Sequence, residues 1–137
     1  MRDAPDSRPD PVTELLLAQA GEITEPVAIL DDVSGALTAE LTARGHRPRV
    51  WCDDVRSEGA VPEASRRATP RQAVTGARTV LWRLPRAVGA VEEYAELIAR
   101  HADPGVRVIA AERDKHLSRS MNTALARSFD SVTASLG

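Results

Sequence analysis

Short apolar runs alternate with amphipathic segments along the chain, and this alternation is the main structural signal in the sequence. Residues 106–111 form a run of β-branched and small apolar side chains, interrupted only by Arg107, which is typical of a strand covered on both faces of a parallel sheet. Further strands are predicted at 26–30, 48–52, 78–84 and, from its period-two alternation, 131–135.

Helical periodicity fills most of the intervals between these strands. In residues 88–101, Val91, Tyr94 and Ile98 share one face, whereas the glutamates around them face water. Other helices are predicted at 12–20, 34–44 and 118–129, and Gly45 lies where a glycine commonly ends a helix. Residues 55–77 show no clear pattern. The alternating order predicts a Rossmann-like α/β fold with a mostly parallel sheet and helices on both faces.

The length of 137 residues suits one domain with a single core. Residues 1–11 are rich in proline and aspartate and predict a flexible arm, which leaves 12–137 as the Rossmann-like domain. Cys52 is the only cysteine, which excludes an intramolecular disulfide and favours a reducing compartment. There is no signal peptide and no apolar stretch long enough for a membrane span, so a cytoplasmic protein without membrane contact is expected.

Charge is distributed unevenly along the chain. The formal net charge is −2, which on bulk grounds argues against a binder of polyanions, but the acidic excess lies in residues 1–40 and the remainder is mildly basic. Arginine accounts for almost all basic residues. Arginine recognises phosphate well, and a coding bias towards arginine and alanine explains the same composition.

Residues 26–137 resemble the N-terminal domain of bacterial ribosomal RNA guanine-N2 methyltransferases, the two-domain "methyltransferase small" group, and the C-terminal third resembles the close of that domain most specifically. The resemblance rests on the loop 114–117 (Asp-Lys-His-Leu) after a strand, and on a later strand that ends with 135–137 (Ser-Leu-Gly). A weaker match is the strand 80–85, which ends in Leu-Pro and precedes a helix containing Tyr94 and Leu97. The resemblance implies a degenerate methyltransferase-like domain that has lost its cofactor site.

The resemblance also implies that catalysis belongs to another domain. The family's catalytic signature is an Asn-Pro-Pro-aromatic loop, and the only asparagine here, Asn122, is followed by Thr123. A catalytic domain that binds S-adenosylmethionine is therefore expected downstream of this chain and absent from it, and no catalytic residue is assigned.

The first strand-to-helix turn is the position at which a Rossmann fold would bind a nucleotide or S-adenosylmethionine. Asp31 and Gly35 lie in this turn, and Asp53 at the end of the next strand is placed to hold ribose hydroxyls. With one glycine, the turn leaves the side chains of Val33, Ser34 and Ala36 in the way of a ligand. The predicted site is therefore vestigial, and capping of the helix by Asp32 or Ser34 is the main alternative.

Basic residues gather at three places that suit contacts with phosphate, although any one of these groups alone is more often a solvated surface. Two groups are Arg44/Arg47/Arg49 and Arg66/Arg67/Arg71. The third is the set of RNA-binding candidates after strand 106–111, namely Arg113, Lys115, His116 and Arg119. These cations oppose the positive end of the following helix, so a role other than stability is expected for them. The three histidines have no ligand spacing, and no metal site is predicted.

The sequence thus predicts a non-catalytic domain that positions structured ribosomal RNA and supports a catalytic methyltransferase domain. A self-contained small enzyme that binds S-adenosylmethionine or a nucleotide through Asp31, Gly35 and Asp53 is one alternative. A protein-interaction module is another, and the net charge of −2 keeps it open.

Overall fold

Four parallel strands form the sheet in the computed structural model, which describes residues 11–53, 55–85 and 87–111. The strands are β1 (Val27–Leu30), β2 (Arg49–Trp51), β3 (Thr79–Arg83) and β4 (Arg107–Ala111). Their order across the sheet is β2-β1-β3-β4, and every neighbouring pair is parallel. The chain steps outward from β1 to β2 and then crosses back to β3, so the topological switch point lies between the carboxyl ends of β1 and β3.

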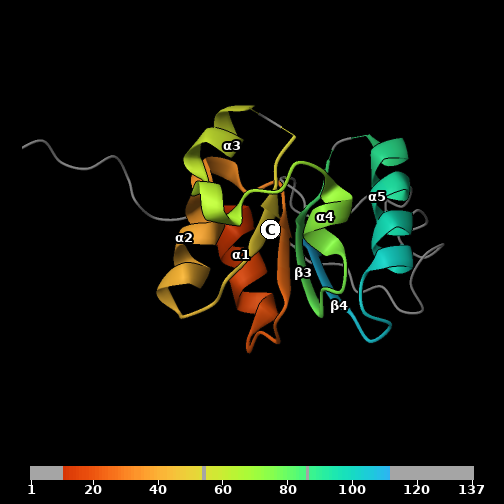
Figure 1. The fold of residues 1–137 in the computed structure, drawn as a ribbon, viewed down its shortest axis with the longest axis horizontal. Helices are drawn as coiled ribbons and strands as arrows, with labels where there is room; N and C mark the ends of the chain where they lie inside the picture. The colour runs from red at the N-terminus through yellow and green to blue at the C-terminus, as the bar shows by residue number, and fades with distance from the viewer. Residues whose placement is uncertain (1–10, 54, 86, 112–137) are drawn as a thin grey trace, which may run out of the picture.

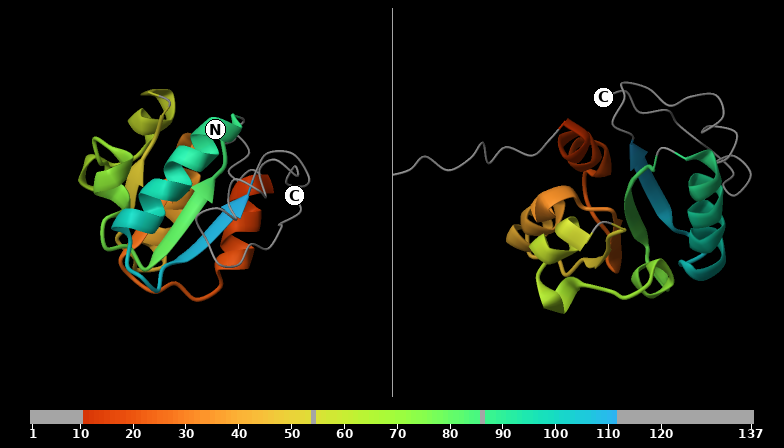
Figure 2. Two further views of the ribbon diagram at one scale, coloured as in Figure 1. Left: turned by 90° about the vertical axis from the view of Figure 1, so that its right-hand side faces the viewer. Right: turned by 90° about the horizontal axis from the view of Figure 1, so that it is seen from above.

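Helices cover both faces of this sheet (Figures 1 and 2). On one face lie α1 (Pro11–Ala20) and α2 (Ala36–Ala43), and on the other lie α4 (Pro70–Val74) and α5 (Val88–His101). The short helix α3 (Val55–Ala60) and two 3-10 turns, η1 (Val33–Gly35) and η2 (Glu63–Ser65), complete the described residues. The predicted Rossmann-like α/β fold is confirmed.

Burial on both faces explains why β1 is a continuous apolar run. Ala28 and Leu30 pack among the residues facing α4 and α5, whereas Val27 and Ile29 pack towards α1 and α2. All four side chains are at most 1% exposed. Because successive side chains of a strand point to opposite faces, a strand between two helical layers has no position left for a polar residue.

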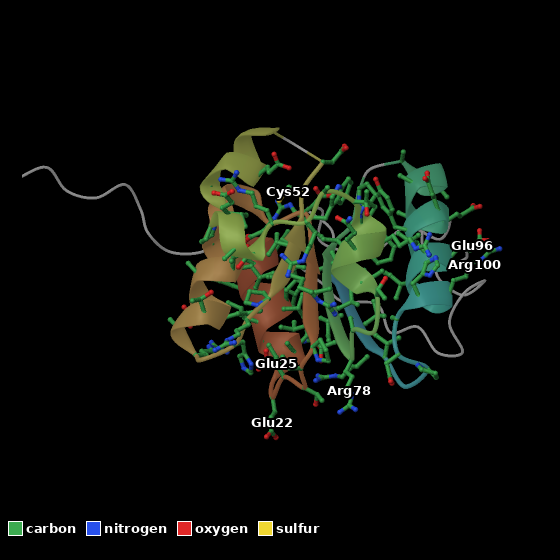
Figure 3. All side chains as sticks on the ribbon, in the orientation of Figure 1. Glu22, Glu25, Cys52, Arg78, Glu96 and Arg100 are labelled. Carbon is green, nitrogen blue, oxygen red and sulfur yellow. The ribbon has the colours of Figure 1, made fainter. Side chains whose placement is uncertain are left out.

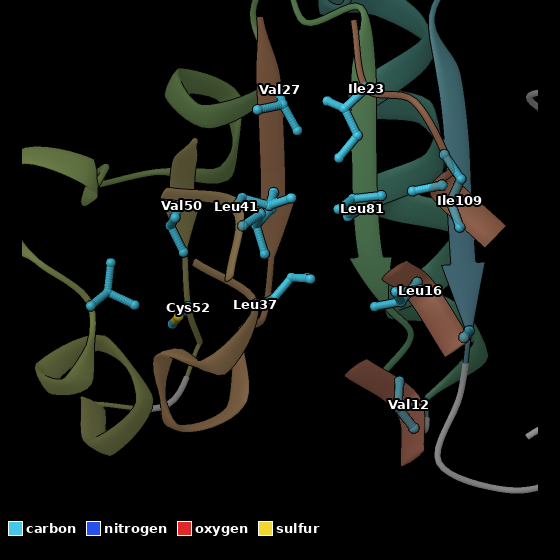
Figure 4. Close-up of a cluster of buried hydrophobic side chains, with 14 residues drawn as sticks. Val12, Leu16, Ile23, Val27, Leu37, Leu41, Val50, Cys52, Leu81 and Ile109 are labelled. Carbon is cyan, nitrogen blue, oxygen red and sulfur yellow. The ribbon is translucent and has the colours of Figure 1, made fainter. Parts of the chain in front are cut away.

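The core under α1 and α2 joins distant parts of the sequence (Figure 4). Val12 and Leu16 of α1 and Leu37 and Leu41 of α2 pack on the same side of the sheet as Leu81. Each fully buried side chain of this size contributes about 1.5 to 3 kcal/mol through removal of apolar surface from water. The amphipathic helix predicted at 88–101 is α5, and its buried face carries Val91, Ala95 and Ile98.

The predicted strands and helices that fall in the described residues are found within two residues of their expected ends. The prediction left residues 55–77 unassigned, and there the structure has α3, η2 and α4, which are all short. The helix at 118–129, the strand at 131–135 and all of the predicted arm except Pro11, where α1 begins, fall outside the described residues. None of the described helices is long and apolar enough to cross a membrane.

Candidate functional site

Asp31 and Asp53 meet at the carboxyl edge of the sheet, beside the switch point. The backbone N–H of Asp31 donates to the carbonyl oxygen of Trp51 at 2.8 Å, which continues the ladder between β1 and β2. Asp31 Oδ1 accepts a hydrogen bond from the backbone N–H of Asp53 at 2.8 Å. Asp31 has a left-handed backbone with φ of 65°. The structure therefore brings Asp31 and Asp53 together, and the carboxylate of Asp31 is hydrogen-bonded to the backbone of Asp53.

Asp32 is buried and stabilises the start of α2. Its carboxylate oxygens accept hydrogen bonds from the backbone N–H groups of Leu37 at 2.9 Å and Thr38 at 2.7 Å, and from the Thr38 hydroxyl. These are the second and third N–H groups of a helix that has Gly35 at its N-cap position. Free N–H groups at a helix start need such acceptors, so the predicted capping role of Asp32 is confirmed.

Gly35 is held in a close contact with α3. Its φ is +71°, and a β-carbon added there would lie 2.6 Å from the carbonyl oxygen of Ala60. The backbone of Ala60 therefore lies where a β-carbon at residue 35 would project, and only a glycine leaves room for it. The turn was expected to be crowded by Val33, Ser34 and Ala36, yet the close approach comes from residue 60, in a segment with no predicted structure.

Three aromatic rings lie next to these acids on the side of α4 and α5. The Tyr94 ring contacts Trp51 with centroids 5.4 Å apart and Trp82 at 6.4 Å, both in edge-to-face geometry. Trp82 is fully buried, and its Nε1 has no hydrogen-bond partner among the described residues. Burial raises the pKa of the Tyr94 hydroxyl, and the negative charges of Asp53 and Asp31 raise it further.

Cys52 directly follows β2 and precedes Asp53 in the sequence (Figure 3). The thiol is buried, and Sγ lies 3.8 Å from the carbonyl oxygen of Asp32, to which it donates. Burial raises the pKa of Cys52 to about 11, against a weaker lowering by that hydrogen bond. The thiol is therefore protonated at neutral pH and is a packing residue, not a nucleophile.

Two arginine groups that are separate in the sequence meet at the outer edge of β2. The backbone N–H of Arg67 donates to the carbonyl oxygen of Val50 at 2.8 Å, and Arg66 forms an isolated parallel bridge with Val50. Arg49 is half-buried, and its Nε and Nη2 have no hydrogen-bond partner among the described residues. Burial lowers the pKa of Arg49, and the nearby positive charge of Arg67 lowers it further.

The predicted site residues thus divide into two groups. Asp31, Gly35 and Asp53 are at the carboxyl edge as expected, whereas Arg113, Lys115, His116 and Arg119 lie outside the described residues. Trp51, Tyr94 and the Arg49–Arg67 pair were not predicted. Alternation along β2 places Arg49 and Trp51 on one face, but no sequence signal connects Arg49 with Arg67. Among residues 11–53, 55–85 and 87–111, no group of three His, Cys, Asp or Glu side chains could hold a metal ion.

Comparison with known families agrees with the earlier resemblance. No curated protein gives a significant match to the chain. The sequence does match the family described as the RLMG N-terminal domain, over residues 10–137, which include every strand and helix described above. The chain belongs to the RLMG N-terminal domain family, whose members are N-terminal domains of ribosomal RNA methyltransferases.

Proposed function

We propose that this domain recognises structured ribosomal RNA and supports the catalytic domain of an S-adenosylmethionine-dependent rRNA (guanine-N2-)methyltransferase, without binding S-adenosylmethionine itself. Membership of the RLMG N-terminal domain family supports the assignment to an rRNA methyltransferase. Cofactor chemistry is expected in a separate domain.

The observation that carries the non-catalytic part of the proposal is the contact between Gly35 and Ala60. A nucleotide-binding turn uses glycines so that a ligand can approach the backbone closely. Here the backbone of residue 60 makes that approach, because an added β-carbon would lie 2.6 Å from its carbonyl oxygen. Asp31, which would otherwise face a ligand, accepts a hydrogen bond from Asp53.

Recognition of RNA is supported by the chemistry of two regions. Trp51 and Tyr94 are half-buried rings at the carboxyl edge, and such rings suit stacking by unpaired bases. The sequence after β4 contains Arg113, Lys115, His116 and Arg119, and these cations suit contacts with backbone phosphates. A membrane and a metal ion play no part in this function.

Cofactor binding is tested by titration calorimetry of the 137-residue chain with S-adenosylmethionine. We expect no binding heat. A dissociation constant in the micromolar range that is lost in Asp53→Ala would contradict the proposal and support a self-contained enzyme.

RNA binding is tested by gel shift with structured ribosomal RNA fragments at several salt concentrations. The double variant Lys115→Ala/Arg119→Ala should bind more weakly, with a salt slope shallower by roughly one unit per lost phosphate contact. The matched control is Arg78→Ala/Arg100→Ala, which removes the same charge from exposed positions at the amino edge and on α5 (Figure 3). Absence of binding by the unmodified chain would favour the protein-interaction module.

A further inference from the structure

Arg49 is a charged side chain that the described fold does not satisfy. Two of its guanidinium nitrogens, Nε and Nη2, are removed from water and have no hydrogen-bond partner among the described residues. Removing a charged donor from water without giving it an acceptor costs free energy, and buried cations in folded proteins normally have an acceptor or a counter-ion. The missing partner is therefore a hydrogen-bond acceptor, and a negatively charged one would compensate best.

The positive charge of Arg67 makes an unpaired Arg49 less favourable still. Arg67 lies close enough to Arg49 to lower its pKa. The chain holds this residue beside β2 through the hydrogen bond from its backbone N–H to Val50 at 2.8 Å. Arg67 Nη1 donates to the carbonyl oxygens of Ala64 at 3.1 Å and Arg66 at 2.8 Å, which fixes the direction of its side chain. Two like charges held near one another are unfavourable unless an anion lies between them.

The chemistry of the two side chains selects the kind of anion. A guanidinium group offers several N–H donors in a planar fork that matches the oxygens of a phosphate group. No carboxylate forms an ion pair with Arg49 among the described residues. Trp51 follows on the same face of β2, because side chains two apart along a strand point the same way, and it is half-buried. A ring beside the cations suits a base attached to the bound phosphate.

We infer that Arg49 and Arg67 form a binding site for a phosphate group at the outer edge of β2, and that this phosphate belongs to an RNA backbone. The RNA part rests on the proposed function, whereas the phosphate part rests only on the two side chains. The site lies on strand β2 and the segment beside it, and none of its residues belongs to the stretch 113–119.

The first test measures thermal unfolding of the 137-residue chain in sodium phosphate and in sodium chloride of equal ionic strength. Phosphate should raise the unfolding midpoint of the unmodified chain, because a ligand that binds only the folded state stabilises it. The same rise is expected for the control Arg100→Gln, whose side chain is 70% exposed on α5 and pairs with Glu96. Arg49→Gln should lose the difference between the two salts. An equal rise in all three proteins would overturn the site, since it would reflect a general salt effect.

The second test measures binding of a structured ribosomal RNA fragment across a range of salt concentrations. Arg49→Gln should bind about five- to tenfold more weakly and show a log–log salt slope shallower by about one, whereas Arg100→Gln should match the unmodified chain. Arg67→Gln, which removes side-chain hydrogen bonds that are exposed, should change binding in the same direction and is a check against misfolding of the first variant. Far-ultraviolet circular dichroism of each variant checks the fold.

The outcomes separate the site from the proposed function. If the unmodified chain binds RNA and both arginine variants bind equally well with unchanged slopes, the site is wrong and RNA recognition stands. If phosphate stabilises only proteins that retain Arg49 but no RNA binds, the phosphate site stands, and both its RNA source and the proposed function are wrong. If neither phosphate nor RNA has an effect, both proposals are wrong.

Discussion

Asp32 and Arg49 are both charged residues partly or wholly removed from water, and the fold treats them in opposite ways. Asp32 is 1% exposed, and its oxygens accept hydrogen bonds from two backbone N–H groups and one hydroxyl in the first turn of α2. Arg49 is half-buried and has two guanidinium nitrogens without partners among the described residues. The contrast separates a charge that the fold itself satisfies from a charge that the described residues leave unsatisfied.

The same contrast distinguishes the regions around these residues. Around Asp32, Gly35 packs against the backbone of Ala60 and Cys52 donates to the carbonyl of Asp32, so the first strand-to-helix turn is filled by the protein's own atoms. Around Arg49, Arg67 adds a second positive charge. We therefore expect substitutions in the first region to change stability, and substitutions in the second region to change binding.

The largest effect is expected for Asp32→Ala. This substitution leaves the N–H groups of Leu37 and Thr38 without their acceptors at the start of α2, at a cost of about 3 to 5 kcal/mol. Urea unfolding measures the difference. Asp53→Ala removes the same charge from an exposed side chain at the same edge and should change stability by at most about 0.5 kcal/mol. Equal losses in the two variants would show that the hydrogen bonds from Asp32 to the start of α2 do not account for the loss.

A smaller loss is expected for Gly35→Ala. The new β-carbon would lie 2.6 Å from the Ala60 carbonyl oxygen, and the residue has a positive φ that alanine adopts poorly. We expect a loss of roughly 2 to 3 kcal/mol in urea unfolding, from backbone displacement and strain. Gly59→Ala is the matched control, because its β-carbon would meet no atom within 4 Å. A neutral result for Gly35→Ala would mean that α3 moves away easily and that the turn can open to a ligand.

The buried thiol of Cys52 makes the stability of the folded chain depend on pH. In the unfolded chain the thiol loses its proton near its ordinary pKa of 9.0, whereas in the folded chain it does so only at about 11. Between these values the unfolded state releases a proton that the folded state keeps, so stability falls as pH rises. The expected loss is about 2 kcal/mol between pH 8 and pH 11. Cys52→Ala should show a smaller fall in urea unfolding over the same range, and equal slopes would show that the thiol is not as deeply buried as its 7% exposure indicates.

The smallest change is expected for Arg49→Met in chloride buffer without phosphate. Methionine retains the length of the side chain and removes the unsatisfied guanidinium, so stability should stay the same or rise by up to about 1 kcal/mol. The free energy of unfolding, measured in urea, should therefore not fall as it does in Asp32→Ala. A loss of more than about 1 kcal/mol would mean that the fold already satisfies Arg49, and would remove the reason to expect an anion beside it.

Residues with strong local patterns could be placed from the sequence. The apolar run of β1 and the helical periodicity of α5 predicted these elements closely, because burial on one or both faces leaves a direct trace in residue order. Asp32 was one of two predicted capping residues, because its residue type and its position just before a predicted helix favour capping. The contact of Gly35 with Ala60 and the approach of Arg67 to Arg49 could not be predicted, since both depend on how the connection from β2 to β3 folds back, and its short helices carry no clear period.

The connection that carries Arg66 and Arg67 has a further consequence for how this domain behaves at high concentration. An exposed strand edge offers unpaired N–H and C=O groups to strands of other molecules and so promotes aggregation. Here the carbonyl of Val50 is already engaged by Arg67, and Arg66 bridges the same residue. With the central residue of β2 occupied and two positive charges beside it, this edge is a poor template for a strand of another copy.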